Sequence, residues 1–140
     1  MIMQETGGAL GHPGDKGKSF GLMQVQITSE AHINCAPGSC TADDITRMLQ
    51  QGIFGHTGTG APVSPGIAYA LANENIAAAL RVYNTGRVVD ANNLQAATPC
   101  STSSYVSDIG NRLLGISPDG FPSPQQLQGK CGFVPASTAC

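Results

Sequence analysis

Glu5 is the carboxylate whose surroundings best suit acid catalysis. It follows Ile2 and Met3 in a short apolar stretch and precedes the pair Gly7-Gly8, which is typical of a helix end. The negative pole of a helix dipole and partial burial both disfavour the ionised form of a carboxyl group. A glutamic acid that keeps its proton near neutral pH can serve as the general acid of a glycosidase. The same local pattern also fits a glutamate that merely faces water.

Other motifs with chemical potential are incomplete. Gly17-Lys18-Ser19 has the ending of a phosphate-binding P-loop, but the glycine required five positions before Gly17 is His12. The run 17–21 matches the G-x-S-x-G nucleophile elbow, yet an elbow needs a sharp strand-to-helix turn, and loop-forming residues precede this run. The histidines share no metal-ligand spacing; they are His12, His32 and His56. We therefore expect no serine hydrolase, no metal site and no cofactor.

Helical periodicity dominates the elements that must position these residues. Residues 1–5 predict the last turn of a helix, followed by a glycine-rich loop at 7–19 and an apolar segment at 20–25. Thr41, with Asp44 three residues later, predicts a capped helix start. The expected buried stripe of this helix is Ile45, Met48 and Leu49, and Gly52 is expected to end or weaken it. Residues 55–66 are expected to form another loop.

Further helices are predicted in the second half of the chain. Ser64-Pro65 is a typical helix start, followed at helical spacing by Ile67, Ala68 and Leu71. The next stretch closes at Gly86 and has one face made of Ile76, Ala79, Leu80 and Tyr83. A final helix over about 102–114 stops at Gly115, with the inward residues Val106, Ile109 and Leu113. Strand signals are scarce, so the predicted class is mainly α.

Composition limits the classes of partner. The length of 140 residues suits one domain rather than two. Charged residues make up 11%, against about 25% in an average protein, and the net charge is −2. Seven scattered lysines and arginines do not form the basic surface that nucleic acid requires. The hydrophobic content of 41% argues against disorder, and no stretch approaches the roughly 18 apolar residues of a membrane span. We expect a soluble monomer without nucleic-acid or membrane partners.

Five cysteines, at positions 35, 40, 100, 131 and 140, favour structural disulfides in an oxidising compartment. The nearest partners in sequence are Cys35 with Cys40 and Cys131 with Cys140, although the connectivity stays open. The residues after Ser117 include four prolines and are expected to be extended and held by cysteines. Because the cysteine count is odd and residues 1–5 lack export-signal character, we expect further residues upstream, with a helix segment and a sixth cysteine.

Three segments together resemble one family. They are Glu5-Thr6-Gly7, the run 14–17 leading into Phe20-Gly21-Leu22-Met23-Gln24-Val25, and Val82-Tyr83-Asn84-Thr85-Gly86. They are similar, in order, to three signatures of the lysozyme-like superfamily: a catalytic glutamate followed by serine, a G-L-M-Q segment and an A-Y-N-x-G helix end. Within it the sequence resembles goose-type lysozymes and soluble lytic transglycosylases. The resemblance covers residues 1–115 and implies a mainly helical lysozyme-like catalytic domain with a sugar cleft between its lobes. Residues 116–140 lie outside the resemblance and are expected to form a disulfide-held tail.

The resemblance implies two pairs of substrate-binding residues. Met23 and Gln24 match residues that line the floor of the cleft. Tyr83 and Asn84 match the pair that lies beside the catalytic acid and holds the sugar. A tyrosine ring offers a stacking face, and an amide offers hydrogen bonds to hydroxyl or N-acetyl groups. Ordinary core packing of Tyr83 is compatible with this role.

The same resemblance implies the catalytic residues. Glu5 matches the general acid, and Thr6 stands where serine is usual while keeping the hydroxyl. Asp15 stands where goose-type enzymes carry an aspartate that positions water, as an inverting hydrolase requires. A simple turn aspartate also fits a Gly-Asp pair. Some goose-type enzymes carry a second aspartate where this chain has Gln26, which leaves Asp15 as the sole nearby candidate.

These residues favour one function and leave two alternatives. We expect a secreted inverting muramidase, with Glu5 and Asp15 as its catalytic residues. It would hydrolyse the β-1,4 linkages between N-acetylmuramic acid and N-acetylglucosamine in the glycan strands of bacterial peptidoglycan. The first alternative is a lytic transglycosylase, in which the substrate's own hydroxyl captures the sugar cation and forms 1,6-anhydro-muropeptides. The second is an inactive sugar-binding relative.

Overall fold

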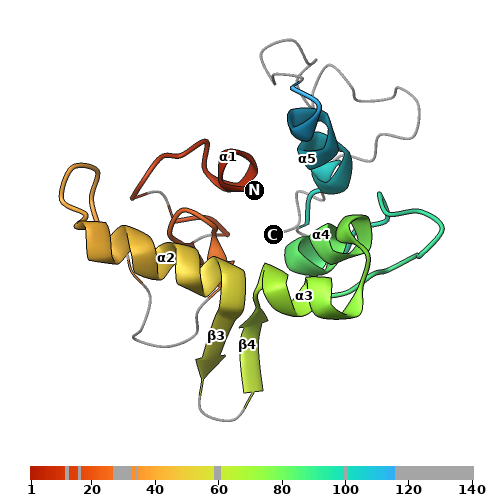
Figure 1. The fold of residues 1–140 in the computed structure, drawn as a ribbon, viewed down its shortest axis with the longest axis horizontal. Coiled ribbons are helices and arrows are strands. Elements are labelled where there is room, and N and C mark those ends of the chain that lie inside the picture. Colours follow the sequence, from red (N-terminus) through yellow and green to blue (C-terminus); the bar gives the residue numbers. More distant parts are fainter. Residues whose placement is uncertain are drawn as a thin grey trace. The chain divides into compact units, whose positions relative to one another are not determined.

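The structure is a computed structural model (Figure 1), and it describes residues 1–11, 13–15, 17–26, 33, 35–58, 61–99 and 101–115. The chain divides into two compact units, Met1–Asn75 and Ile76–Cys140, which are taken one at a time. The described part contains five helices and two short two-stranded sheets, which confirms the mainly helical class. None of the helices in that part is long and apolar enough to cross a membrane. The expected domain at 1–115 spans both units, and the expected tail at 116–140 lies outside the described residues.

The first unit begins with the single-turn helix α1 (Ile2–Glu5). Gly7 and Gly8 follow it with φ angles of +63° and +84°, the left-handed region that glycine adopts without a Cβ penalty. The expected glycine stop after Glu5 is therefore confirmed. A helix of one turn has little stability of its own, so its position depends on tertiary contacts.

A small hairpin follows the glycine-rich loop. Strand β1 (Ser19–Phe20) pairs antiparallel with β2 (Val25–Gln26), and Ser19 lies opposite Gln26. An isolated bridge between Gly14 and Ser19 closes the loop that precedes β1. The apolar segment at 20–25 is therefore folded back on itself around a turn at 21–24.

Helix α2 (Ala42–Phe54) starts as the sequence predicts. The Thr41 hydroxyl accepts a hydrogen bond from the Asp44 N–H at 3.1 Å, and the Asp44 carboxylate accepts one from the Thr41 N–H at 2.9 Å. This reciprocal capping box satisfies two backbone donors that a helix start otherwise leaves without partners.

Gly52 does not end this helix, which was one of the two effects expected of it. Helix α2 continues through Gly52 to Phe54. A Cβ added at Gly52 would lie 2.2 Å from the Met23 sulfur and 2.6 Å from the Met23 Cβ. The residue is glycine because the helix passes close to the hairpin at this point, and a side chain would not fit.

The prediction of a loop over 55–66 is wrong. Strand β3 (Gly55–Gly58) follows α2 directly and pairs antiparallel with β4 (Ala61–Pro65), with an irregular register after His56. Figure 1 shows this hairpin leaving the end of α2 and leading into α3 (Ile67–Asn73). The helix begins after Gly66, two residues later than the predicted Ser64-Pro65 start, because those residues complete β4. The strands were missed because glycine and proline are both depleted in strands.

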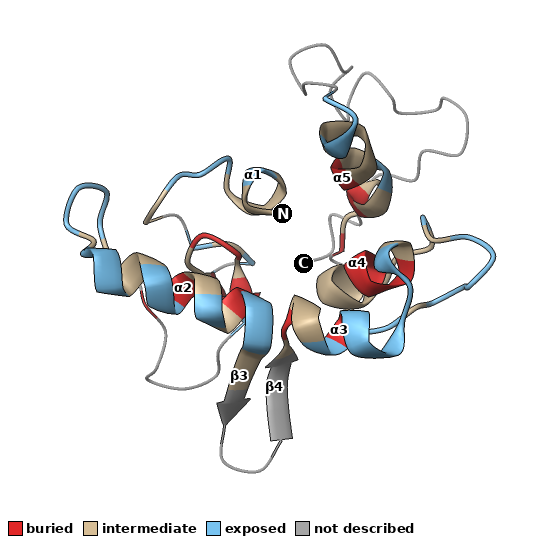
Figure 2. Ribbon diagram, viewed as in Figure 1, coloured by how far each residue is buried: buried red, intermediate tan, exposed pale blue. Residues whose placement is uncertain are grey.

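The core of the first unit is built around three buried side chains, Leu22, Ile33 and Met48. Half-buried neighbours pack against them: Ile2, Leu10, Cys35, Cys40, Ile45 and Leu49. Full burial of a side chain of this size contributes about 1.5–3 kcal/mol, so these contacts hold α1, the hairpin and α2 together. The predicted inner stripe of α2 is confirmed, and Figure 2 shows buried positions on both α2 and the neighbouring hairpin.

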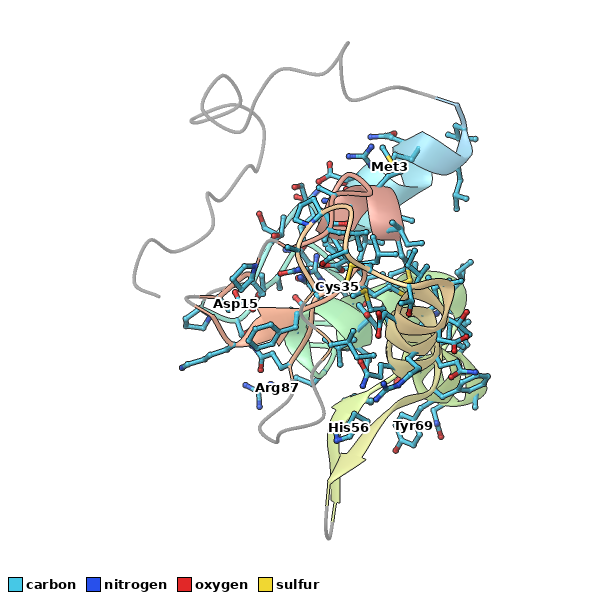
Figure 3. The ribbon with its side chains drawn as sticks, turned by 90° about the vertical axis from the view of Figure 1, so that its left-hand side faces the viewer. Met3, Asp15, Cys35, His56, Tyr69 and Arg87 are labelled. Carbon is cyan, nitrogen blue, oxygen red and sulfur yellow. A yellow bond between two sulfur atoms is a disulfide. The ribbon has the colours of Figure 1, made fainter. Side chains whose placement is uncertain are left out.

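Cys35 and Cys40 form a disulfide beside this core. The bridge confirms that these sequence neighbours are partners, and Figure 3 labels Cys35. It lies in the first unit, whereas the disulfides expected in the C-terminal tail fall on residues outside the description. Cys100, Cys131 and Cys140 lie outside the described residues, as does the whole predicted tail.

The second unit is described as two helices, α4 (Ile76–Thr85) and α5 (Tyr105–Leu113). Its buried apolar residues are Ala78, Ala79, Leu80, Tyr105 and Ile109. The predicted face of α4 is confirmed at Ala79 and Leu80, whereas Ile76 at its start is exposed. Gly86 follows α4 with a φ of +78°, as a glycine stop requires.

Helix α5 starts later than predicted, whereas its predicted stop at Gly115 is confirmed. It begins at Tyr105 rather than near 102, and Tyr105 is buried although its role in the core was not predicted. Ile109 faces inward as expected and Val106 is half-buried, but Leu113 is 72% exposed. The inward assignment of Leu113 is therefore wrong: the buried residues of the helix are Tyr105 and Ile109, in its first and middle turns. Gly115 follows the helix with a φ of +77°.

Candidate functional site

The six residues assigned to a site fall into two groups. The first unit holds Glu5, Asp15, Met23 and Gln24, and the second holds Tyr83 and Asn84. The geometry of each group is set by contacts inside its own unit.

Glu5 is half-buried and is the last residue of α1. The next residue, Thr6, donates a hydrogen bond from its hydroxyl to the Leu22 carbonyl oxygen at 3.1 Å. The same hydroxyl oxygen accepts the N–H of Gly8 at 3.2 Å. The structure therefore joins the first and second motifs of the sequence, because Leu22 belongs to the G-L-M-Q segment.

Asp15 is exposed and lies in the loop before β1, where Figure 3 labels it. Its φ of +48° is in the left-handed region, which aspartate tolerates better than most residues. The loop is compact because the Gly14 carbonyl oxygen accepts the N–H groups of Gly17, Lys18 and Ser19. This backbone holds the aspartate in one place at the edge of the hairpin.

The Asp15 carboxylate is bound on one side by the hairpin strands. The Ser19 hydroxyl donates to Asp15 Oδ2, and the Gln26 amide nitrogen donates to the same oxygen at 3.3 Å. Ser19 is only 1% exposed, so its hydroxyl is fixed in the interior beneath the carboxylate. Among the residues that the structure describes, no hydrogen-bond donor binds Asp15 Oδ1. The carboxylate is therefore oriented through Oδ2, and Oδ1 is left without a protein donor among the described residues.

Gln24 is held beside this loop in an unusual backbone conformation. Its φ is +49°, which costs of order 1 kcal/mol for a residue other than glycine. Its side-chain nitrogen donates to the Gly21 carbonyl oxygen at 3.0 Å. Its side-chain oxygen would lie 2.1 Å from a Cβ added at Gly14. The Gln24 side chain can approach the backbone this closely because residue 14 is glycine. The structure thus brings Gln24 next to the residue that precedes Asp15.

Met23 has a different environment from Gln24. It is 4% exposed and packs against Gly52 of α2 in the interior of the first unit. Its sulfur and methyl group fill the space that a side chain at Gly52 would take. Met23 therefore packs the β1–β2 hairpin against α2.

Ser19, at the centre of the G-x-S-x-G match, is not placed as a nucleophile elbow would place it. It is buried in β1, and the chain continues through a turn into β2 rather than into a helix. The strand-to-helix turn that such an elbow requires is not formed at these residues. The Ser19 hydroxyl instead donates a hydrogen bond to the Asp15 carboxylate.

In the second unit, Tyr83 and Asn84 are half-buried on the last turn of α4. The Asn84 side-chain oxygen accepts a hydrogen bond from Arg81 Nη1 at 2.9 Å. Arg81 is completely buried, and burial lowers the pKa of its guanidinium, while Tyr105 acts in the opposite direction. The Asn84 side chain is therefore held by a hydrogen bond from a buried cation.

Sequence reasoning did not assign Ser19, Gln26 or Arg81 to the site. The antiparallel register that puts Ser19 opposite Gln26, beside Asp15, was not visible without the strands. Arg81 carried no signal, since a cation next to Leu80 on a helix is ordinarily solvated. Within the described ranges, no group of three or more His, Cys, Asp or Glu could hold a metal ion. His56 lies in β3, and His12 and His32 fall outside the description.

Comparison with known proteins adds no assignment: no family model, no curated protein and no solved structure matches the chain. The lysozyme-like fold and the activity that the resemblance implies therefore stay predictions.

Proposed function

We propose that the protein is an inverting muramidase that hydrolyses the β-1,4 linkage between N-acetylmuramic acid and N-acetylglucosamine in peptidoglycan. Glu5 is its general acid and Asp15 positions the attacking water. The observation that carries the proposal is the Asp15 carboxylate, which receives hydrogen bonds from Ser19 and Gln26 through Oδ2 alone. The donation from a buried serine distinguishes Asp15 from a turn aspartate that is bound by water alone.

The arrangement of Asp15 suits the task of a water-binding base. A carboxylate with one oxygen fixed by protein donors keeps the acceptor sites of the other oxygen for water. In an inverting glycosidase this water attacks the anomeric carbon from the face opposite the leaving group. As the new carbon–oxygen bond forms, the carboxylate accepts a proton from the water, and a protonated Glu5 gives its proton to the departing glycosidic oxygen. Both carboxyl groups return to their starting states by exchange with solvent.

The position of Glu5 supports the same mechanism. It lies at a helix end that the Thr6–Leu22 hydrogen bond ties to the G-L-M-Q segment, so the acid is held by tertiary structure rather than by its one-turn helix. Gln24, on that segment, offers an amide for sugar hydroxyl groups. In the second unit, Tyr83 and Asn84 on α4 are the further sugar-binding residues of the proposal. Met23, also in the proposed set, lies in the interior of the first unit.

The Cys35–Cys40 disulfide supports the proposal that the protein acts outside the cell, where peptidoglycan is met and disulfides persist. We propose that the working form is a monomer that binds glycan strands and needs no cofactor.

Mass spectrometry of digested bacterial cell wall tests the reaction. Hydrolysis leaves reducing N-acetylmuramic acid ends, whereas a transglycosylase leaves 1,6-anhydro ends. Reducing ends as the main product, with a single anomer formed initially, are expected. Anhydro ends as the main product would assign the transglycosylase reaction, and the absence of any cleavage by the full chain would assign a sugar-binding protein.

Two variants assign the roles. Glu5→Gln keeps the shape of the side chain but has no proton of suitable acidity, so turnover should be lost while the protein stays folded. Asp15→Asn keeps the shape but accepts protons poorly, so kcat should fall by about a hundredfold or more with little change in binding. Wild-type turnover in either variant would remove that residue from the mechanism.

A further inference from the structure

Arg81 is a buried cation that the proposed mechanism does not use. It lies on α4, is completely buried and donates to four neutral oxygens. Three of them are backbone carbonyls: Nε donates to Leu94 at 2.7 Å, Nη1 to Thr102 at 2.9 Å and Nη2 to Ser103 at 2.7 Å. The fourth is the side-chain oxygen of Asn84, 2.9 Å from Nη1.

Stability alone is a weak reason to keep such a residue. A buried charge without an oppositely charged partner is costly, and an apolar side chain of similar volume often replaces a buried ion at no loss of stability. An arginine at this position nevertheless does what no apolar residue does, because its planar group holds several donors in fixed directions. Three of those directions tie the chain at 94 and 102–103 to α4, and the fourth reaches a side chain.

The contact with Asn84 fixes which way its amide points. A guanidinium has only N–H donors and no acceptor, so the Asn84 atom that faces Arg81 must be the oxygen. The amide nitrogen, with its two N–H groups, is then turned away from Arg81. Among the described residues no acceptor binds these N–H groups, and Asn84 is partly exposed. A rotation of the amide would bring its N–H groups against the guanidinium donors, so the orientation is locked.

We propose that Arg81 is a positioning residue that presents the Asn84 amide as a hydrogen-bond donor to the substrate. The ligand group that it selects is a hydrogen-bond acceptor, which in a chain of N-acetylated sugars is the acetamido carbonyl oxygen. This inference rests on the proposed function, because that function makes Asn84 a sugar-binding residue. It adds the direction of the hydrogen bond and the residue that sets it.

The substitution Asn84→Asp separates this role from a purely structural one. The aspartate keeps an oxygen toward Arg81 and gains a charge-assisted hydrogen bond there, so the midpoint of thermal unfolding should be unchanged or raised. Its outer atom becomes an acceptor facing an acceptor. The affinity of the full chain for tri-N-acetylchitotriose, measured by calorimetry, should therefore fall by about tenfold or more. Asn92→Asp is the matched control, since Asn92 is exposed on the same unit and its side chain makes no described hydrogen bond.

Arg81→Lys provides the second arm. Lysine keeps the charge, but its single ammonium group cannot span four oxygens, so the orientation of the Asn84 amide is no longer fixed. The affinity of the Arg81→Lys variant for the same oligosaccharide should therefore also fall. It is measured at a temperature where circular dichroism shows a folded protein. If Arg81→Lys fails to fold, the Asn84→Asp measurement decides the inference by itself.

The outcomes distinguish the two proposals. Unchanged affinity in Asn84→Asp, or in folded Arg81→Lys, overturns the role of Arg81 and leaves the muramidase proposal standing. Oligosaccharide binding with the expected loss in the variants, but without cleavage of cell wall, upholds the role of Arg81 and overturns the muramidase. A wild-type chain that binds no N-acetylated oligosaccharide overturns both.

Discussion

The Thr6 hydroxyl donates a hydrogen bond to the carbonyl oxygen of Leu22, 3.1 Å away and 16 residues further along the chain. The contact links the residue after Glu5 to the buried centre of the first unit, because Leu22 belongs to its core. It gives a structural reason for a hydroxyl at this position.

Removal of this hydroxyl should loosen α1. Thr6→Val keeps the shape of the side chain but loses the bond to Leu22 and the acceptor for the Gly8 N–H. The free energy of unfolding should fall by about 1–2 kcal/mol, as measured by urea denaturation. Thr6→Ser is the matched control and should retain most of the stability. Equal stability of the valine and serine variants would show that the hydrogen bond does not anchor α1.

Ser19 should affect the rate of the reaction more than the binding of substrate. Ser19→Ala removes the buried donor to the Asp15 carboxylate and leaves Gln26 as its remaining described partner. Loss of one charge-assisted hydrogen bond corresponds to about 1.5 kcal/mol, so kcat on cell wall should fall about tenfold with little change in KM. Ser107→Ala, which removes an exposed hydroxyl on α5, should leave both constants unchanged. A rise in KM without a fall in kcat would show that Ser19 does not act through Asp15.

Two helical glycines should respond in opposite ways to the same substitution. Gly52→Ala forces a methyl group into Met23, and overpacking of this kind costs about 1–3 kcal/mol, which outweighs a gain in helix propensity of about 1 kcal/mol. Gly110→Ala on α5 meets nothing within 4 Å and should stabilise by up to about 1 kcal/mol. Thermal unfolding of the two variants measures both signs. A Gly52→Ala protein as stable as wild type would show that the hairpin moves freely away from α2.

The capping box of α2 should make stability depend on pH. The backbone N–H of Thr41 and then its hydroxyl, with a smaller effect of Arg47, lower the pKa of Asp44 from its ordinary value of 3.8. Because the pKa is lower in the folded state, the carboxylate stabilises the fold above the ordinary value, and this contribution is lost as the pH falls through the folded value. The stability difference between wild type and Asp44→Asn should therefore be largest near pH 7 and shrink below about pH 4. A difference that does not vary between pH 7 and pH 3 would contradict this linkage.

Local sequence patterns were enough to predict much of this architecture. The Thr41–Asp44 cap, the glycine stops after Glu5 and Thr85, and the Ile45–Met48–Leu49 stripe all depend on residues within one or two helical turns of each other. The Cys35–Cys40 disulfide joins cysteines that are close in sequence, but its pairing was left open until the structure showed it. Such features are visible in sequence because their energetics are local.

The assignments that failed or were missed depend on strand pairing and on tertiary contacts, which a helical repeat does not reveal. Gly52 continues its helix because Met23 packs against it, and the strands at 55–58 and 61–65 form despite their glycine and proline residues because they pair with each other. The partners of Asp15 come from both strands of a hairpin, and Arg81 is buried by carbonyl groups 13 to 22 residues away. Helical periodicity reveals none of these interactions, and those of Gly52 and Arg81 join residues 13 or more positions apart. They exist only once packing has excluded water, because hydrogen bonds and steric fit gain their energetic weight from burial.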